Sequence, residues 1–93
     1  MSSSPLLHCG FGNYLMIDQL IALVDVKTSA SRRILRSINE EKPRNLIDIG
    51  RGRKALTLII LTGDRYIKSP IPRKQLARRL GMFDVVEEAP VAS

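Results

Sequence analysis

Short apolar runs separated by polar residues and glycines fill the first part of the chain. Residues 6–9 (LLHC) form the first run, and residues 10–13 (GFGN) end it. Two further runs, YLMI and LIALVDV, follow within residues 14–26 and are separated by Asp18 and Gln19. Apolar runs of about four to eight residues between turn residues are typical of β-strands. The pattern predicts a strand, a tight turn, and then two short strands or one kinked strand.

A helical pattern follows these strands. Ile34 and Ile38 are four residues apart and share one face with Leu35 in a helix predicted over residues 32–41. Hydroxyl side chains accept hydrogen bonds at helix N-termini, and three of them are candidate caps: Thr28, Ser29 and Ser31. Pro43 ends this helix, because proline has no backbone N–H to donate.

The second half of the chain contains the most apolar strand pattern. Residues 45–49 (NLIDI) predict one strand, and residues 55–61 (ALTLIIL) predict a central strand buried on both faces. The turn TGDR, in which Gly63 adopts the special dihedral angles, leads into the antiparallel strand YIKS. A second helix is predicted over residues 70–81 (PIPRKQLARRLG).

These elements give the order β-β-β-α-β-β-β-α. The predicted fold is α+β, a mostly antiparallel sheet with two helices packed against it. Residues 6–82 form one domain, because a chain of this size has room for a single core. Residues 1–5 are expected to be a disordered N-terminus, and residues 83–93 an acidic, flexible tail. A domain this small buries a low fraction of its surface, which favours self-association.

The chain is strongly basic, and its charge is unevenly distributed. It holds 15 Lys and Arg against 9 Asp and Glu, a net charge of +6. Three of the acids, Asp84, Glu87 and Glu88, lie in the last ten residues, so residues 1–83 carry 15 basic and 6 acidic side chains, or +9. A compact domain with this excess attracts polyanions, which are DNA, RNA or an anionic membrane face. Neither predicted helix has enough large apolar side chains to insert into a membrane, which disfavours a membrane face as the partner.

Residues suited to catalysis or metal binding are sparse. His8 is the only histidine and Cys9 the only cysteine, so the sequence offers no intramolecular disulfide and no zinc-ligand cluster. As neighbours on a strand they face opposite sides, which favours structural roles for both. The lone cysteine and the absence of a signal-peptide pattern predict a cytoplasmic protein. We expect no enzyme activity, catalytic residue, metal, cofactor or small-molecule substrate.

The segment GFGN resembles half of a phosphate-binding loop. A dinucleotide-binding loop needs a third glycine and a following helix, whereas the residues after this segment have a strand pattern. We therefore interpret Gly10, Gly12 and Asn13 as a structural turn, because all three residues tolerate positive φ.

Residues 50–54 (GRGRK), here called the basic loop, separate two predicted strands. Gly52 lets the backbone approach an anion, while Arg51, Arg53 and Lys54 bring positive charge to it. At the tip of a two-stranded ribbon, such a loop can enter a DNA groove; the alternative is a solvated hairpin tip. Asp48 precedes the loop, and the sequence leaves two roles open for it: an ion pair with Arg51 or Arg53, or the cap of a turn.

The remaining clustered cations lie on the two predicted helices: Arg32, Arg33 and Arg36 on the first, and Arg73, Lys74, Arg78 and Arg79 on the second. A solvated helix face usually mixes charges of both signs, whereas the second helix is wholly basic. This excess favours binding of a polyanion. The expected secondary contacts with nucleic acid are Lys74, Arg78, Arg32 and Arg33.

Four segments in this order, CGFGNYLMIDQLIALV, LIDIGRGRKALTLIIL, GDRYIKS and LARRL, resemble the RemA-type family of bacterial matrix-gene regulators. The resemblance runs from about Leu7 to Leu80. It implies a small cytoplasmic α+β protein that assembles into rings, binds DNA as the assembled ring and regulates transcription. It implies no enzymatic activity.

The resemblance also implies roles for individual residues. Arg53 and Lys54 match two adjacent basic residues that contact DNA in the family. Gln19 stands where the family usually has a basic residue, and Arg51 is the candidate to replace that charge. On these grounds we expect a ring-shaped homo-oligomer that contacts and bends duplex DNA through repeated basic loops. The alternatives are a small basic RNA-binding module, or a structural scaffold that binds no nucleic acid.

Overall fold

The computed structural model describes residues 6–81 and confirms the α+β class and the predicted order of elements. The predicted disordered N-terminus and acidic tail lie outside these residues. Two short 3-10 helices span Ile17–Gln19 and Pro43–Asn45. The main elements are β1 (Leu6–Gly10), β2 (Asn13–Met16), β3 (Leu20–Asp25), α1 (Ser29–Glu41), β4 (Leu46–Asp48), β5 (Thr57–Leu61), β6 (Arg65–Ser69) and α2 (Arg73–Arg79).

The six strands form two separate sheets. Among the strands of residues 6–81, β1 and β2 pair only with each other, as an antiparallel hairpin. The other four strands form a sheet in the order β3-β5-β6-β4, in which β5 pairs antiparallel with both neighbours and β4 pairs parallel with β6. The predicted central strand is confirmed, because β5 lies inside this sheet and three of its apolar side chains are buried: Leu58, Ile59 and Leu61.

One prediction about this sheet is wrong. β4 and β5, which flank the basic loop, are not neighbours, because β6 lies between them. The basic loop is therefore not the tip of a two-stranded ribbon. It forms part of a crossover that carries the chain from an edge strand to the centre of the sheet. The local sequence shows where each strand begins and ends, but strand order depends on contacts between distant segments.

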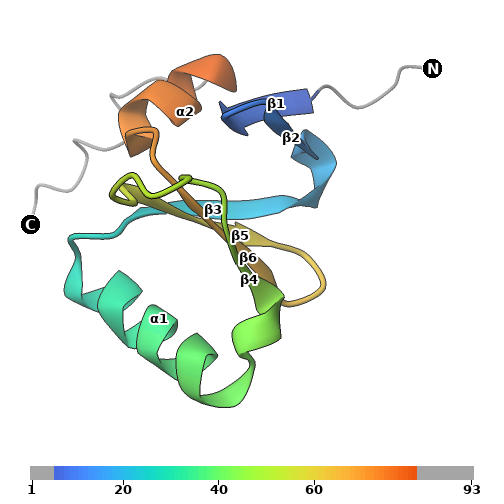
Figure 1. Ribbon diagram of the computed structural model, residues 1–93. Coiled ribbons are helices and arrows are strands. Elements are labelled where there is room, and N and C mark those ends of the chain that lie inside the picture. Colours follow the sequence, from blue (N-terminus) through green and yellow to red (C-terminus); the bar gives the residue numbers. More distant parts are fainter. Residues whose placement is uncertain (1–5, 82–93) are drawn as a thin grey trace, which may run out of the picture.

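The four-stranded sheet lies between two layers (Figure 1). α1 covers one face, and the β1-β2 hairpin covers the other together with α2 (Figure 1). The buried cluster on the hairpin side consists of Leu7, Cys9, Leu15, Ile59, Leu61 and Leu76. Ile38 of α1 is also buried, outside this cluster. Successive residues of a strand face opposite sides, so Leu58 and Ile59 of β5 contribute to different layers.

The ends of α1 follow the signals in the sequence. Of the three candidate caps, Thr28 is the N-cap, and its hydroxyl accepts a hydrogen bond from the backbone N–H of Ser31 at 3.1 Å. The helix starts at Ser29, three residues before the predicted start, and it ends before Pro43. The segment 14–26 forms two strands rather than one kinked strand, with the 3-10 helix Ile17–Gln19 between them.

Candidate nucleic-acid interface

The basic loop contains a tight turn whose shape follows from local hydrogen bonds. The backbone N–H of Arg53 donates to the carbonyl of Gly50 at 2.9 Å, which closes a four-residue turn. Both central residues have positive φ, 53° for Arg51 and 88° for Gly52. That combination defines a type I′ turn. Arg51 adopts a left-handed backbone conformation that residues other than Gly, Asn and Asp rarely take.

Asp48 caps the start of this turn. Its Oδ1 accepts a hydrogen bond from the backbone N–H of Gly50 at 2.8 Å, and its Oδ2 lies 3.9 Å from the Nζ of Lys68. Within the described residues, Asp48 forms no ion pair with Arg51 or Arg53. Of the two roles left open for Asp48, the turn cap is correct and the ion pair with the loop arginines is wrong.

Gly50 is required at its position for steric reasons. It is buried, and a Cβ atom there would lie 2.9 Å from the carbonyl oxygen of Arg53 and 3.2 Å from Oδ1 of Asp48. The second of these atoms, Oδ1 of Asp48, accepts the hydrogen bond from Gly50 that caps the turn. Only glycine therefore lets the chain close the turn so tightly.

The β1-β2 hairpin reverses direction through a turn of the same kind. Phe11 and Gly12 are its central residues, with φ of 51° and 76°. The side-chain amide of Asn13 donates to the carbonyls of Gly10 at 3.0 Å and of Phe11 at 3.3 Å. Gly10 has a φ of 120° and faces Pro70, whose ring atoms would lie 3.4 Å from an added Cβ.

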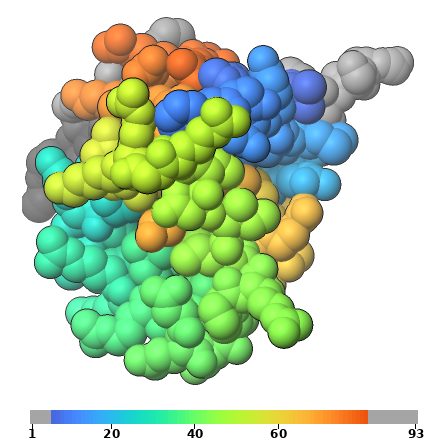
Figure 2. All heavy atoms as spheres, in the orientation of Figure 1, coloured from blue at the N-terminus to red at the C-terminus, as the bar shows by residue number. Residues whose placement is uncertain are grey.

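The fold brings these two turns together. The guanidinium carbon of Arg51 lies 5.2 Å from the ring centroid of Phe11, and that of Arg53 lies 5.7 Å from it. Both distances are within the range of cation–π interactions. Figure 2 shows side chains of the basic loop, in yellow-green, on the molecular face beside the blue hairpin. A hollow of about 300 Å³ lies between the two turns, next to Pro70 and Ile71.

Phe11 is the residue of this site that the sequence reasoning missed. A signal for it exists: the first central position of a type I′ hairpin turn usually holds Asn, Asp or Gly, and here it holds an aromatic residue. A residue that breaks a local preference is often retained for function.

The three cations of the basic loop are available to a ligand. Arg51, Arg53 and Lys54 are all exposed. In the part of the chain that the structure describes, none of them forms an ion pair with a carboxylate. Their charges are therefore not neutralised by neighbours within residues 6–81, as expected for a surface that attracts phosphate groups.

The cations of the helices are divided between two sides of the molecule. α2 lies on the hairpin side, where Lys74 and Arg78 are exposed. α1 lies across the sheet, so its exposed arginines Arg32 and Arg33 are separated from the basic loop by the sheet (Figure 1). A single copy therefore does not present all predicted contacts to one straight ligand.

Gln19, at the position where a basic residue was expected, is paired with an arginine. Its Oε1 accepts a hydrogen bond from Nη2 of Arg65 at 2.9 Å. Arg51, the candidate to replace the expected charge, lies instead against Phe11. Arg65 is thus the cation that the fold places directly beside Gln19.

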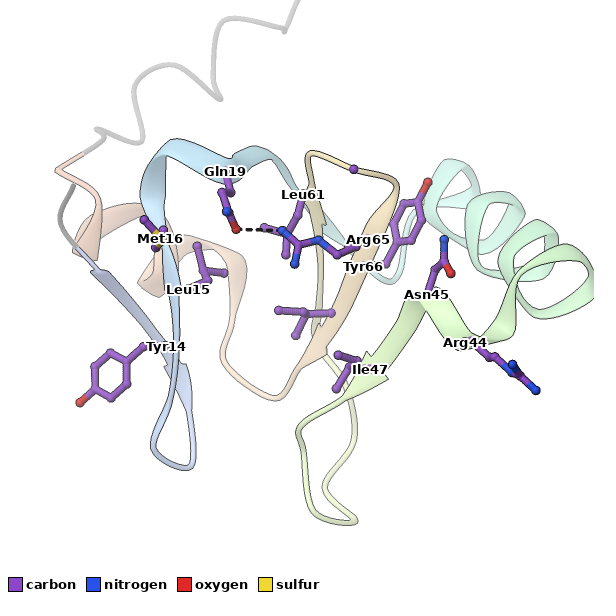
Figure 3. A pocket seen from close by; sticks show the side chains of 12 residues that line it. Tyr14, Leu15, Met16, Gln19, Arg44, Asn45, Ile47, Leu61, Arg65 and Tyr66 are labelled. Atoms are coloured by element: carbon purple, nitrogen blue, oxygen red, sulfur yellow. Dashed lines mark hydrogen bonds between the residues drawn. The ribbon is translucent and has the colours of Figure 1, made fainter. Parts of the chain in front are cut away.

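Gln19 and Arg65 lie on a groove of about 450 Å³ (Figure 3). The hairpin strand β2 contributes Tyr14, Leu15 and Met16 to one side, and residues of the large sheet, including Ile47, line the other (Figure 3). Tyr14 and Ile47 are large and highly exposed, at 61% and 58%. The groove therefore offers apolar surface to a partner.

Residues 6–81 offer neither a metal-ligand cluster nor a membrane-spanning helix. In this range no group of three His, Cys, Asp or Glu side chains is arranged to hold a metal ion. Neither of its α-helices combines the length and the apolar character that crossing a membrane requires.

Comparison with known proteins gives one consistent result. A family model described as RemA-like, extracellular matrix regulatory protein A-like, matches residues 6–80. A protein of Thermoanaerobacter sp. (strain X514) is 35% identical over 92% of this chain and 93% of its own length. One from Halalkalibacterium halodurans is 34% identical over 88% and 92%. One from Nitratidesulfovibrio vulgaris (strain DP4) is 29% identical over 90% and 95%. The names of all three describe regulatory proteins.

Proposed function

This chain belongs to the RemA-like family of regulatory proteins, and from that membership we propose that it regulates transcription as a ring-shaped homo-oligomer that binds and bends duplex DNA. The observation that carries the proposal is the basic loop, a fixed turn with exposed Arg51, Arg53 and Lys54. In this proposal the protein acts in the cytoplasm, has no catalytic role and needs no cofactor.

DNA is held mainly through its phosphates. Arginine offers a planar fork of N–H donors to a phosphate, and lysine offers a point charge. One loop making two or three such contacts binds weakly. An oligomer repeats the loop, and repetition raises the overall affinity without adding new kinds of contact. Bending a short duplex across several loops costs about 1–6 kcal/mol, so easily deformed sequences are favoured even without base contacts.

Self-association has candidate surfaces at the two edges of the large sheet. β3 and β4 are its edge strands, and each exposes an isoleucine: Ile21 at 62% and Ile47 at 58%. A contact between the β3 edge of one copy and the β4 edge of the next joins two different surfaces. Such a head-to-tail contact generates a ring when the rotation closes. The two exposed edges therefore support a ring of identical copies.

Duplex DNA is favoured over single-stranded RNA by the aromatic side chains. Single-stranded RNA is usually bound by aromatic rings on which bases stack. The ring of Phe11 lies against two guanidinium groups, and that of Tyr14 lies 5.0 Å from the ring of His8. These partners leave both rings less free to stack on bases than isolated aromatic side chains would be.

The test is fluorescence anisotropy of labelled duplexes at several salt concentrations, with sedimentation velocity of the same sample. We expect oligomers, and binding that weakens with a log–log slope of about −0.9 for each phosphate contact. An AT-rich, easily bent duplex should bind more tightly than a random duplex. Sedimentation of monomers alone would exclude the ring, and a weak response without salt dependence would exclude DNA. Tighter binding of single-stranded RNA would favour the RNA alternative.

A pair of variants with equal charge locates the contact. Arg53→Ala/Lys54→Ala removes two cations from the basic loop, and Arg32→Ala/Arg33→Ala removes two from α1. We expect the loop variant to stay oligomeric but lose DNA binding, while the α1 variant keeps most of its affinity. Equal losses in both variants would show that only total charge matters, and would contradict the assignment of the loop.

A further inference from the structure

The backbone of Phe11 adopts a conformation that is costly for an aromatic residue. Phe11 has a φ of 51°, in the left-handed region, at a position where type I′ turns prefer Asn, Asp or Gly. Its side chain is 37% exposed, so burial in the core does not explain its presence. The turn itself would form more readily with asparagine. The benefit of a ring at this position must come from what the ring contacts.

What the ring contacts is the basic loop. Arg51 and Arg53 both place their guanidinium groups within cation–π distance of this one ring, at 5.2 and 5.7 Å from its centroid. Arg51 is itself in the left-handed region, with a φ of 53°. Two unfavourable backbone conformations, in turns about 40 residues apart in sequence, thus point a ring and a guanidinium toward each other. Strain of this kind persists where the surrounding structure enforces it, and it collects at functional sites.

A guanidinium keeps its charge and its free N–H donors beside an aromatic ring, but not beside a carboxylate. A carboxylate would orient a guanidinium but would cancel its charge and occupy its N–H donors. The face of a ring orients the guanidinium while its charge remains and its N–H edge stays free for an anion. The nearest acid in sequence, Asp48, is used on the N–H of Gly50 and lies near Lys68 instead.

We propose that Phe11 is a positioning residue for nucleic-acid binding: its ring holds Arg51 and Arg53 as a pre-ordered pair for the phosphates of the DNA backbone. This inference rests on the proposed function and names the residue that prepares its binding site. Long arginine side chains lose conformational freedom when they bind, and a ring that orders them beforehand reduces that loss. Phe11 then acts on affinity without contributing a charge.

Three substitutions of Phe11 separate this role from others. Phe11→Leu keeps apolar volume and removes the ring, and we expect about fivefold weaker binding per loop with an unchanged salt slope, because no charge is lost. Phe11→Tyr keeps the ring and should restore wild-type affinity. Phe11→Asn should bind as weakly as Phe11→Leu while the protein melts at the same or a higher temperature, because asparagine suits the turn.

Each contrary result has a definite meaning. A ring inserted between base steps is the other use of an exposed aromatic, and leucine serves as such a wedge too. Full affinity in Phe11→Leu would therefore overturn the positioning role. Loss of thermal stability in Phe11→Asn would show that Phe11 serves the fold, and would also overturn it. A reduced salt slope in Phe11→Leu would mean that phosphate contacts themselves were lost, and would overturn a role for Phe11 that leaves the number of contacts unchanged.

A measurement without DNA separates this inference from the proposed function. Ring currents of Phe11 shift the side-chain NMR signals of Arg51 and Arg53 in the free protein. We expect these shifts in the wild type and in Phe11→Tyr, and their disappearance in Phe11→Leu. Shifts that are present in a wild-type protein that binds no DNA would refute the proposed function alone. Absent shifts in the wild type would refute the ordering of the arginines, whatever the DNA affinity.

Discussion

Nη1 of Arg79 on α2 donates a hydrogen bond of 2.7 Å to the backbone carbonyl of His8 on β1. The same nitrogen lies 3.3 Å from Nδ1 of the His8 ring. One cation of the wholly basic helix thus joins two elements of the layer above the sheet. The cations of α2 therefore do not share one role, because Arg79 links α2 to β1, although it is exposed like Lys74.

From this contact we expect Arg79→Ala to lower the free energy of unfolding by about 1 kcal/mol, because a hydrogen bond from a charged donor is lost at an exposed site. Lys74→Ala is the matched control and should change the free energy of unfolding by less than about 0.5 kcal/mol. Urea denaturation followed by circular dichroism measures both. Equal midpoints for the two variants would mean that the Arg79 contact contributes nothing to stability.

The turn of the basic loop can be disturbed without altering any charge. In Gly50→Ala, the new Cβ would meet the carbonyl of Arg53 at 2.9 Å, so the turn has to open. We expect a loss of stability of about 1–3 kcal/mol and weaker DNA binding, because the loop arginines move away from Phe11. Anisotropy at one salt concentration measures the affinity.

The control for this variant is Gly81→Ala, at the end of α2. Gly81 has a φ of 81°, so alanine there costs about 1 kcal/mol in backbone strain, but apart from its chain neighbours no atom of residues 6–81 lies within 4 Å of the added Cβ. It should keep its DNA affinity. If both variants bind equally well, the shape of the basic loop is unimportant.

A network of three side chains predicts how stability depends on pH. Nζ of Lys42 lies 2.8 Å from Oδ1 of Asp64, and the hydroxyl of Tyr66 donates to the same oxygen at 2.6 Å. The hydrogen bond from Lys42, followed by that from Tyr66, lowers the pKa of Asp64 below its usual 3.8. The hydrogen bond to Asp64 is the main cause that raises the pKa of Lys42 above 10.5 and that of Tyr66 above 10.0.

The direction of each pH effect follows from the linkage between protonation and folding. The contribution of Asp64 is complete above the pKa of the unfolded chain and is lost as pH falls through the lower folded pKa. The contributions of Lys42 and Tyr66 are complete below pH 10 and are lost as pH rises through their raised values. Asp64→Asn should therefore show a flatter stability profile at both extremes. Urea midpoints between acid and alkaline pH test this, and identical profiles in both proteins would contradict it.

Cys9 should be unreactive in the native protein. Its side chain is fully buried, and burial raises the pKa of its thiol, so the reactive thiolate is disfavoured. We expect slow labelling by a thiol reagent in buffer and rapid labelling in denaturing urea. Rapid labelling of the folded protein would show that the hairpin layer opens readily and exposes the sulfur.

The edges of the large sheet should control self-association. Ile47→Lys places a charge at the exposed β4 edge, and we expect at least about tenfold weaker association, because burial of an isoleucine contributes about 1.5–3 kcal/mol. Leu6→Lys is the control, since Leu6 is 60% exposed but belongs to the separate β1-β2 hairpin. Sedimentation velocity measures both. Unchanged assembly in Ile47→Lys would exclude this edge as a contact.

Local patterns in the sequence predict every main element, with ends within three residues of those observed. Strands and helices differ in the spacing of their apolar residues, and this spacing can be read within a window of a few residues. The stop at Pro43 and the positive φ of Gly63 are equally local, because they depend on the covalent structure of one residue. The basic loop was also visible as a candidate site, because glycines and arginines stand next to each other in the chain.

How these elements meet depends on tertiary contacts. The parallel pairing of β4 with β6 turned the basic loop from a ribbon tip into a crossover, and the layer order placed the arginines of α1 across the sheet. The contact between Phe11 and Arg51 joins two turns about 40 residues apart. No local pattern encodes such contacts, because strand order and layer order depend on the packing of distant segments, and it is this packing that brings the ring of Phe11 to the arginines.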